Sequence, residues 1–151
     1  MKYVRIFLVS LCFIFLFVGC SSNNDGKIDL FDGGCIFKSK PTAIVNPEIG
    51  KGFKDKKIVK PAKVFNKKTP KVYCTYYIEN GKKGTKIKGE WWQKSKNKKI
   101  FESTVTIRKD ENFGLFTLSK PKGGWQPGRY NLLIYVGGRD TPDVIIDFVV
   151  K

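Results

Sequence analysis

Residues 124–136 read GWQPGRYNLLIYV, a turn followed by an alternating strand, and they are the most informative segment for the fold. Glycine and proline in the first part indicate a turn, and the apolar residues after it alternate. Because side chains two apart on a strand share a face, Leu132, Ile134 and Val136 lie on one side and Leu133 and Tyr135 on the other. Similar segments recur from residue 56 to 150, separated by Gly, Pro, Asn and Lys, which predicts an all-β sandwich.

Seven strands are predicted, and no segment has a convincing helical period. They cover residues 56–60 (in one interpretation to 65), 71–78, 85–93, 100–108, 113–119, 129–136 and 144–150. The alternation predicts that Trp91 lies in the core and that Trp92 is exposed. The other residues predicted to face inward are Val72, Cys74, Tyr76, Ile78, Ile87, Gly89, Phe101, Ser103, Val105 and Ile107.

The beginning of the chain has the form of an export signal. Lys2 and Arg5 precede an apolar run at 6–18, which is shorter than the roughly 20 residues that span a bilayer. The expected organisation is a signal peptide at 1–19, a lipidated Cys20 with a flexible tether at 20–52, and a single domain at 53–151. The tether is rich in Ser, Asn, Asp, Gly and Pro, which favour turns and loops.

Phe17-Val18-Gly19-Cys20 resembles the lipobox of bacterial lipoproteins. The resemblance implies that the Cys20 thiol carries diacylglycerol and that its new amino group is often acylated, commonly as palmitate. Ser21 rather than aspartate after the cysteine is similar to lipoproteins sent to the outer membrane, where a cell has one. The alternatives are an uncleaved amino-terminal anchor or an ordinary signal peptide.

The segment Trp125-x-Pro127-Gly128-x-Tyr130 resembles the tyrosine corner of immunoglobulin-like sandwiches in small bacterial surface and periplasmic modules. The resemblance implies a hydrogen bond from the Tyr130 phenol to a nearby backbone group and a buried tryptophan at Trp91. It departs from immunoglobulin domains at Leu132, where the second cysteine of their disulfide is expected. The fold so implied hosts many activities and indicates no function.

The charge of the chain limits the kinds of partner that we expect. The chain has 29 basic and 13 acidic residues, and only Arg5, Arg108, Arg129 and Arg139 of the basic residues are arginines. Because nucleic-acid readers depend on arginine for bidentate contacts, we expect no nucleic-acid partner. The lysines indicate either a solvated coat or attraction to an anionic envelope polymer.

Catalytic chemistry finds little support in the sequence. The chain has no histidine, which excludes Ser-His-Asp and Cys-His catalysis and histidine metal sites. The clustered acids of the domain, Asp110, Glu111, Asp140 and Asp143, fall in predicted turns, where Asp bonds locally. We therefore expect no catalytic residue, no metal and no cofactor apart from the lipid on Cys20. A small carbohydrate-active enzyme with two converging carboxylates is the least favoured alternative.

Exposed aromatic residues among lysines predict a binding surface. Trp92, Lys86, Lys88 and Tyr77 are its expected members, since such a platform stacks on a sugar or docks an envelope protein. A binding module without catalytic activity is therefore the favoured function. The alternative is a structural subunit of an envelope assembly that pairs through a sheet edge. Cys35 and Cys74 either form a disulfide, or Cys74 is simply a buried apolar side chain.

Overall fold

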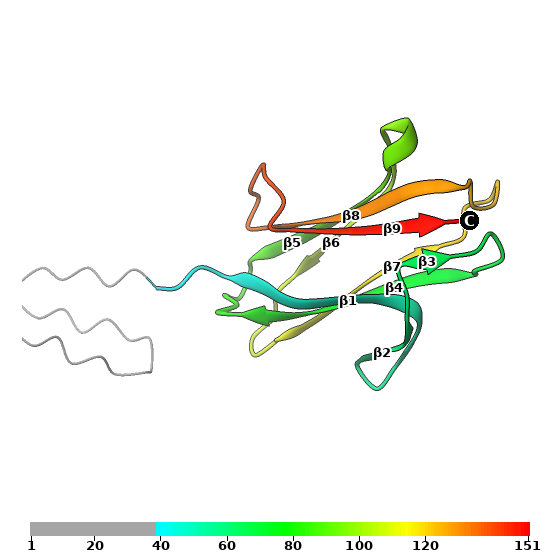
Figure 1. Ribbon diagram of the computed structural model, residues 1–151. Helices are drawn as coiled ribbons and strands as arrows, with labels where there is room; N and C mark the ends of the chain where they lie inside the picture. Colours follow the sequence, from blue (N-terminus) through cyan, green and yellow to red (C-terminus); the bar gives the residue numbers. More distant parts are fainter. Residues whose placement is uncertain (1–38) are drawn as a thin grey trace, which may run out of the picture. The chain divides into compact units, whose positions relative to one another are not determined.

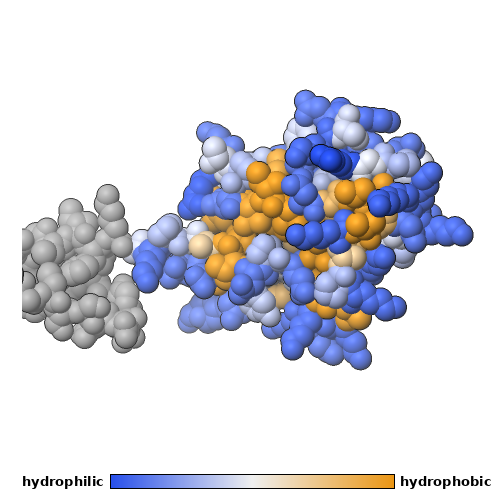
Figure 2. Space-filling view, in the orientation of Figure 1, coloured by the Kyte–Doolittle hydropathy of each residue, from blue (hydrophilic) through white to orange (hydrophobic). Residues whose placement is uncertain are grey.

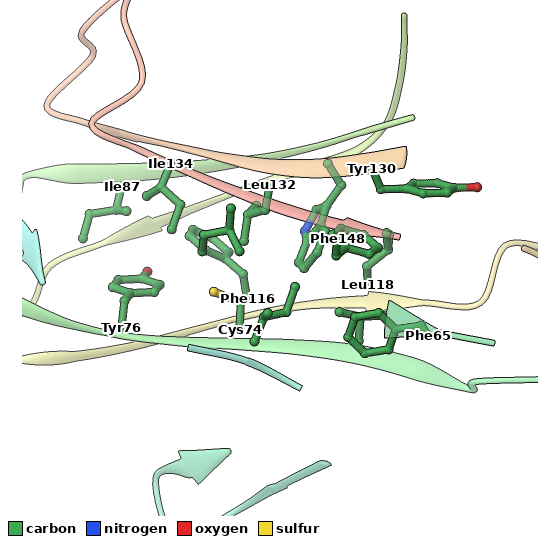
Figure 3. Packing of buried hydrophobic residues seen from close by; sticks show 14 of the residues in the cluster. Phe65, Cys74, Tyr76, Ile87, Phe116, Leu118, Tyr130, Leu132, Ile134 and Phe148 are labelled. Carbon is green, nitrogen blue, oxygen red and sulfur yellow. The ribbon is translucent and has the colours of Figure 1, made fainter. Parts of the chain in front are cut away.

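The computed structural model describes residues 39–151, and the compact unit within it is Lys40–Lys151. The predicted signal peptide, Cys20 and Cys35 lie outside the described residues. The unit is built from two sheets that face each other across the apolar core (Figures 1 and 3). It is therefore a β-sandwich, as the alternating pattern predicts.

The four-stranded sheet has the order β2-β1-β4-β7, and the five-stranded sheet has the order β3-β9-β8-β5-β6. All pairs are antiparallel except β3 with β9. Each of the seven predicted strands is present within two residues at either end. The bounds are β1 Ala43–Lys54, β2 Lys57–Pro61, β3 Val64–Phe65, β4 Lys71–Glu79, β5 Lys86–Gln93, β6 Lys98–Thr106, β7 Phe113–Ser119, β8 Gly128–Val136 and β9 Val144–Val150, with a short 3₁₀ turn at Lys94–Lys96.

The predicted domain boundary at residue 53 is wrong, because β1 occupies Ala43–Lys54 inside the predicted tether. The pairing of β1 with β4 shifts register between Val45 and Glu48, so the strand has no continuous alternation that a sequence pattern can detect. Pro47 and two glycines further disguise it as a loop. The chain joins the domain just before β1, where the Thr42 hydroxyl donates to the Asn80 carbonyl at 2.9 Å.

One side of the core is an aromatic cluster on the inner face of the five-stranded sheet and the loop that leads into β8. Trp91 is fully buried and packs edge-on against Phe148, with ring centroids 5.9 Å apart. Phe148 stacks on Tyr130 at 5.3 Å, and Tyr130 meets Trp125 edge-on at 5.9 Å. The Tyr130 hydroxyl donates to the Gln126 carbonyl at 2.6 Å, which is the hydrogen bond that the tyrosine-corner resemblance implies.

At Phe101 the alternation correctly predicts which face of the sheet the residue occupies, but it does not predict how far the side chain is buried. It pairs with buried Trp91 and shares its face, yet it is 47% exposed. The reason is its position on β6, which forms an edge of the five-stranded sheet with no further strand beside it among the described residues. The prediction that Phe101 belongs to the core is therefore wrong, whereas Val72, Cys74, Tyr76, Ile78, Ile87, Trp91, Ile107, Leu132, Ile134 and Val136 are buried as expected.

Replacing Gly114 by alanine should destabilise the domain by about 1–3 kcal/mol, the usual cost of overpacking a core. A Cβ at Gly114 would lie 2.1 Å from the Tyr76 ring, and that ring is itself fully buried and stacked on Phe116. Urea unfolding measures the effect. Gly123→Ala is the matched control, since its Cβ meets open space, and a similar loss in both variants would contradict this account.

Candidate functional site

The predicted binding residues lie on two different surfaces. Lys86, Lys88 and Trp92 are on β5 in the five-stranded sheet, whereas Tyr77 is on β4 in the four-stranded sheet. We call the first surface the β5 face, made by Lys88, Glu90, Trp92, Lys99 and Tyr135. The second is the Tyr77 cleft, which is lined by Tyr77 and Thr75 of β4 together with residues of the β1–β2 hairpin. The sequence therefore identified parts of two surfaces and wrongly joined them into one.

The β5 face is organised around the carboxylate of Glu90, whose side chain is only 8% exposed. Lys88 Nζ lies 2.9 Å and Lys99 Nζ 3.6 Å from Glu90 Oε1. The indole N–H of Trp92 donates to Glu90 Oε2 at 3.0 Å, and the Tyr135 hydroxyl lies 3.5 Å from the same oxygen. The sequence pattern did not single out Glu90, because alternation does not indicate which neighbours a carboxylate will bond.

Trp92 is half-buried, and the prediction of an exposed platform is wrong. The pairing of β5 with β6 shifts register after Trp91, where Ile100 is the extra residue on β6, and the Trp92 indole N–H is bonded to Glu90. Lys88 Nζ lies 4.4 Å from the centre of the Tyr135 ring, in a cation–π contact. These polar groups satisfy one another, so the β5 face has mainly a structural role.

The electrostatics of Glu90 follow from these partners. Burial opposes ionisation of the carboxyl group, but hydrogen bonds from Lys88 and Trp92, together with the charges of Lys88 and Lys99, outweigh burial. The pKa of Glu90 therefore lies below its ordinary value. The same contacts raise the pKa of Lys88, chiefly through its hydrogen bond to Glu90.

The Tyr77 cleft is a hollow of about 340 Å³ on the outer side of the four-stranded sheet. Tyr77 is 42% exposed, and Thr75 lies beside it on the same face of β4. Among the described residues, the ion pairs of the domain include none of the charged groups in the cleft. The cleft is lined by Asn46, Pro47, Glu48, Lys56, Lys57, Thr75 and Tyr77.

Two backbone irregularities build the cleft. One is the β1 bulge at Asn46, whose φ of 49° is in the left-handed region. The other is the tight β1–β2 turn, in which Asp55 and Lys56 have φ of 50° and 58°. This is the form of a type I′ turn, in which glycine usually follows the first residue. The hairpin bends away from the plane of its sheet (Figure 1), and Thr75 is only 3% exposed although it faces outward.

A row of four aromatic side chains lies beside the cleft. Tyr77 meets Phe113 edge-on at 5.7 Å, Phe113 stacks with Phe53 at 6.1 Å, and Phe53 stacks with Tyr73 at 6.4 Å. Lys56 Nζ lies 6.0 Å from the centre of the Phe113 ring. The row holds Tyr77 in place and leaves one side of its ring accessible. An exposed ring, an amide, a carboxylate and two ammonium groups together can stack on a sugar ring and bond its hydroxyl and acidic groups.

The remaining candidate residues have local roles or lie apart. Asp110 is in the β6–β7 loop, while Asp140 and Asp143 are in the β8–β9 loop. Asp143 accepts the N–H of Val136 at 2.8 Å and pairs with Arg139. Over residues 39–151, no group of three or more potential ligands is placed to hold a metal, and no helix is long and apolar enough to cross a membrane.

Cys74 is fully buried and forms no disulfide within residues 39–151, and burial raises the pKa of its thiol to about 12. This arrangement agrees with the alternative in which Cys74 is a small apolar side chain of the core. Its predicted partner, Cys35, lies outside the described residues.

Comparisons with known proteins assign no function, so the function has to be inferred from the chain itself. No known family model matches it, and no curated protein matches its sequence.

Glu90→Gln should lower the free energy of unfolding by about 1–2 kcal/mol at pH 7, because it removes charge-assisted hydrogen bonds. A lowered folded-state pKa adds stability that is present above the unfolded pKa, near 4.5, and is lost as pH falls through the folded value. The difference between wild type and variant should therefore shrink below pH 4.5. Urea unfolding at pH 7 and pH 3 tests this.

Glu102→Gln is the matched control for that experiment. Glu102 is the cross-strand neighbour of Glu90, but its side chain is 53% exposed, so its pairing with Lys99 contributes little. An equal loss for Glu90→Gln at both pH values would show that shape, and not charge, accounts for the role of Glu90.

Proposed function

We propose that this protein is an exported, lipid-anchored envelope module with an immunoglobulin-like sandwich, which binds an acidic polysaccharide or a similar anionic polymer and catalyses no reaction. The lipobox resemblance at residues 17–20 supports the anchor at Cys20, in the outer membrane where the cell has one. Two acyl chains at Cys20 provide stable attachment. The tyrosine-corner hydrogen bond and buried Trp91 support the immunoglobulin-like type.

The Tyr77 cleft is the observation that carries the binding function. It combines an exposed aromatic ring with Lys56 and Lys57, which are outside the ion pairs of the described domain. Unpaired ammonium groups beside an aromatic ring fit a ligand that has both sugar rings and carboxylates or phosphates.

The charge of the domain supports the same class of ligand. Residues 39–151 contain 25 basic and 10 acidic side chains, a net charge of +15. Such a charge attracts an anionic polymer at long range, and the attraction weakens as salt rises. The field brings the polymer to the domain, and the cleft supplies the specific contacts.

Replacing Lys56 by glycine separates folding from binding. The change should favour folding through the backbone conformation and weaken ligand binding through the lost charge. Its left-handed backbone favours glycine, so Lys56→Gly should leave the domain at least as stable as wild type. Removing the ammonium group should weaken binding to polygalacturonate, a model acidic polysaccharide, about tenfold, which corresponds to about 1.4 kcal/mol. Titration calorimetry and urea unfolding give the two quantities.

The matched control for Lys56→Gly is Lys60→Gly. Lys60 also has a left-handed φ of 61° and an exposed side chain, but it does not line the cleft. Both variants remove one positive charge and relieve one left-handed backbone. Equal weakening by both would reduce the interaction to net charge and would remove the cleft from the proposal.

Cys20→Ser should release the protein from membranes, because serine provides no thiol for the diacylglycerol. Cell fractionation and labelling with a radioactive fatty acid measure the effect, with Cys74→Ala as the control. Membrane association and lipid labelling that persist in Cys20→Ser would contradict the anchor.

A further inference from the structure

The last strand, β9, has an edge that is only partly covered. Its neighbour on that side is β3, a strand of two residues that pairs with Val149 and Val150. Among the described residues, no strand pairs with this edge over 144–147. The edges formed by β2 and β6 carry two lysines each, which disfavour pairing with another chain, whereas the β7 edge and this part of β9 have none.

The backbone of β9 directs hydrogen-bonding groups toward the uncovered edge. The N–H groups of Val149 and Lys151 donate to β3 and its flank, at Lys63 and Phe65, over 2.9 Å each. Because the hydrogen-bonding direction alternates along a strand, the N–H and C=O groups of Ile145 and Asp147 point the same way. The backbone donors and acceptors of these two residues therefore pair with no other strand among the described residues.

A groove of about 640 Å³ opens beside this edge. Its lining includes Ile49 and Ile146, both nearly buried, together with Pro61, Ala62 and Ile145. Ile145 is 56% exposed, which is high for a large apolar side chain. Figure 2 shows apolar side chains gathered on the face that carries β1 and β9 in Figure 1, with hydrophilic side chains around them.

The occupant of this groove must satisfy both the ladder and the apolar lining. An extended polypeptide does so, because it provides backbone donors and acceptors at the strand repeat and places alternate side chains on one side. The rim bears Glu48, Lys63 and Asp147, so the entering segment is selected by its apolar residues more than by charge. A second copy of this chain is disfavoured, since two domains of net charge +15 repel each other.

We propose that β9 accepts an extended segment of an acidic partner protein by strand addition, with its backbone on Ile145 and Asp147 and alternate apolar side chains in the groove. The positive domain attracts such a partner at long range. This interaction uses a surface that shares only Pro47 and Glu48 with the Tyr77 cleft, and it goes beyond the proposed function.

Proline at Asp147 tests the proposal without disturbing the β8–β9 ladder. The Asp147 N–H points to the open edge, so Asp147→Pro removes a docking donor and keeps the bonds to β8. Asp147→Asn is the matched control, because it loses the same charge and keeps the N–H. The weak pairing of Asp147 with Lys94, at 3.7 Å and well exposed, is lost in both.

The probe is a synthetic peptide of alternating threonine and valine with glutamate at both ends, added to the purified full chain. Backbone-amide exchange measured by NMR should slow at least tenfold at Ile145 and Asp147 when the peptide is present. Peptide affinity should fall at least tenfold in Asp147→Pro and change less than about twofold in Asp147→Asn.

Two outcomes would overturn the proposal. One is the absence of peptide binding and of slowed exchange in the wild-type chain. The other is equal binding by the proline and asparagine variants, which would place the peptide elsewhere. Lys56→Gly should leave peptide binding unchanged, so the strand-addition site and the polysaccharide site fail or succeed separately.

Discussion

The structure depends on an aromatic cluster on the inner face of the five-stranded sheet, where Phe148 packs edge-on against Trp91 and stacks on Tyr130. These rings bury a large apolar area in one place, and their edge-on and stacked contacts hold β5, β8 and β9 together as one side of the core. The hydrogen bond from Tyr130 to the Gln126 carbonyl then fixes the loop that leads into β8. With that loop fixed, the register of β8 sets those of β5 and β9 on either side.

The outer surfaces differ because the two sheets cover their polar groups in different ways. On the β5 face, Glu90 accepts the hydrogen bonds of its neighbours, so the charged groups there are paired with one another. On the four-stranded sheet, Thr75 is buried and Tyr77 is exposed beside two lysines that line the cleft. A hollow with unpaired charges suits a ligand better than a surface whose charges are already paired.

Local patterns predicted most of the strands and the central core, but they failed for β1. The alternation of β4, β5 and β8 correctly placed Cys74, Trp91 and Leu132 inside, because one face of each strand is buried. The bulge near Asn46 broke the same signal in β1, so the strand resembled a tether. Since β1 supplies one wall of both the cleft and the groove, that omission hid both surfaces.

Local sequence was enough to predict the alternating strands and the hydrogen bond of Tyr130, because each depends on residues close together in the chain. Lipid attachment at Cys20 stays a prediction, since that residue lies outside the described part of the chain. Which outer residues meet depends on how the strands are ordered in the two sheets. Trp92 and Tyr77 both belong to outward-facing strand positions, yet their strands lie in different sheets. Strand order arises from contacts between distant segments, which alternation within one strand does not encode.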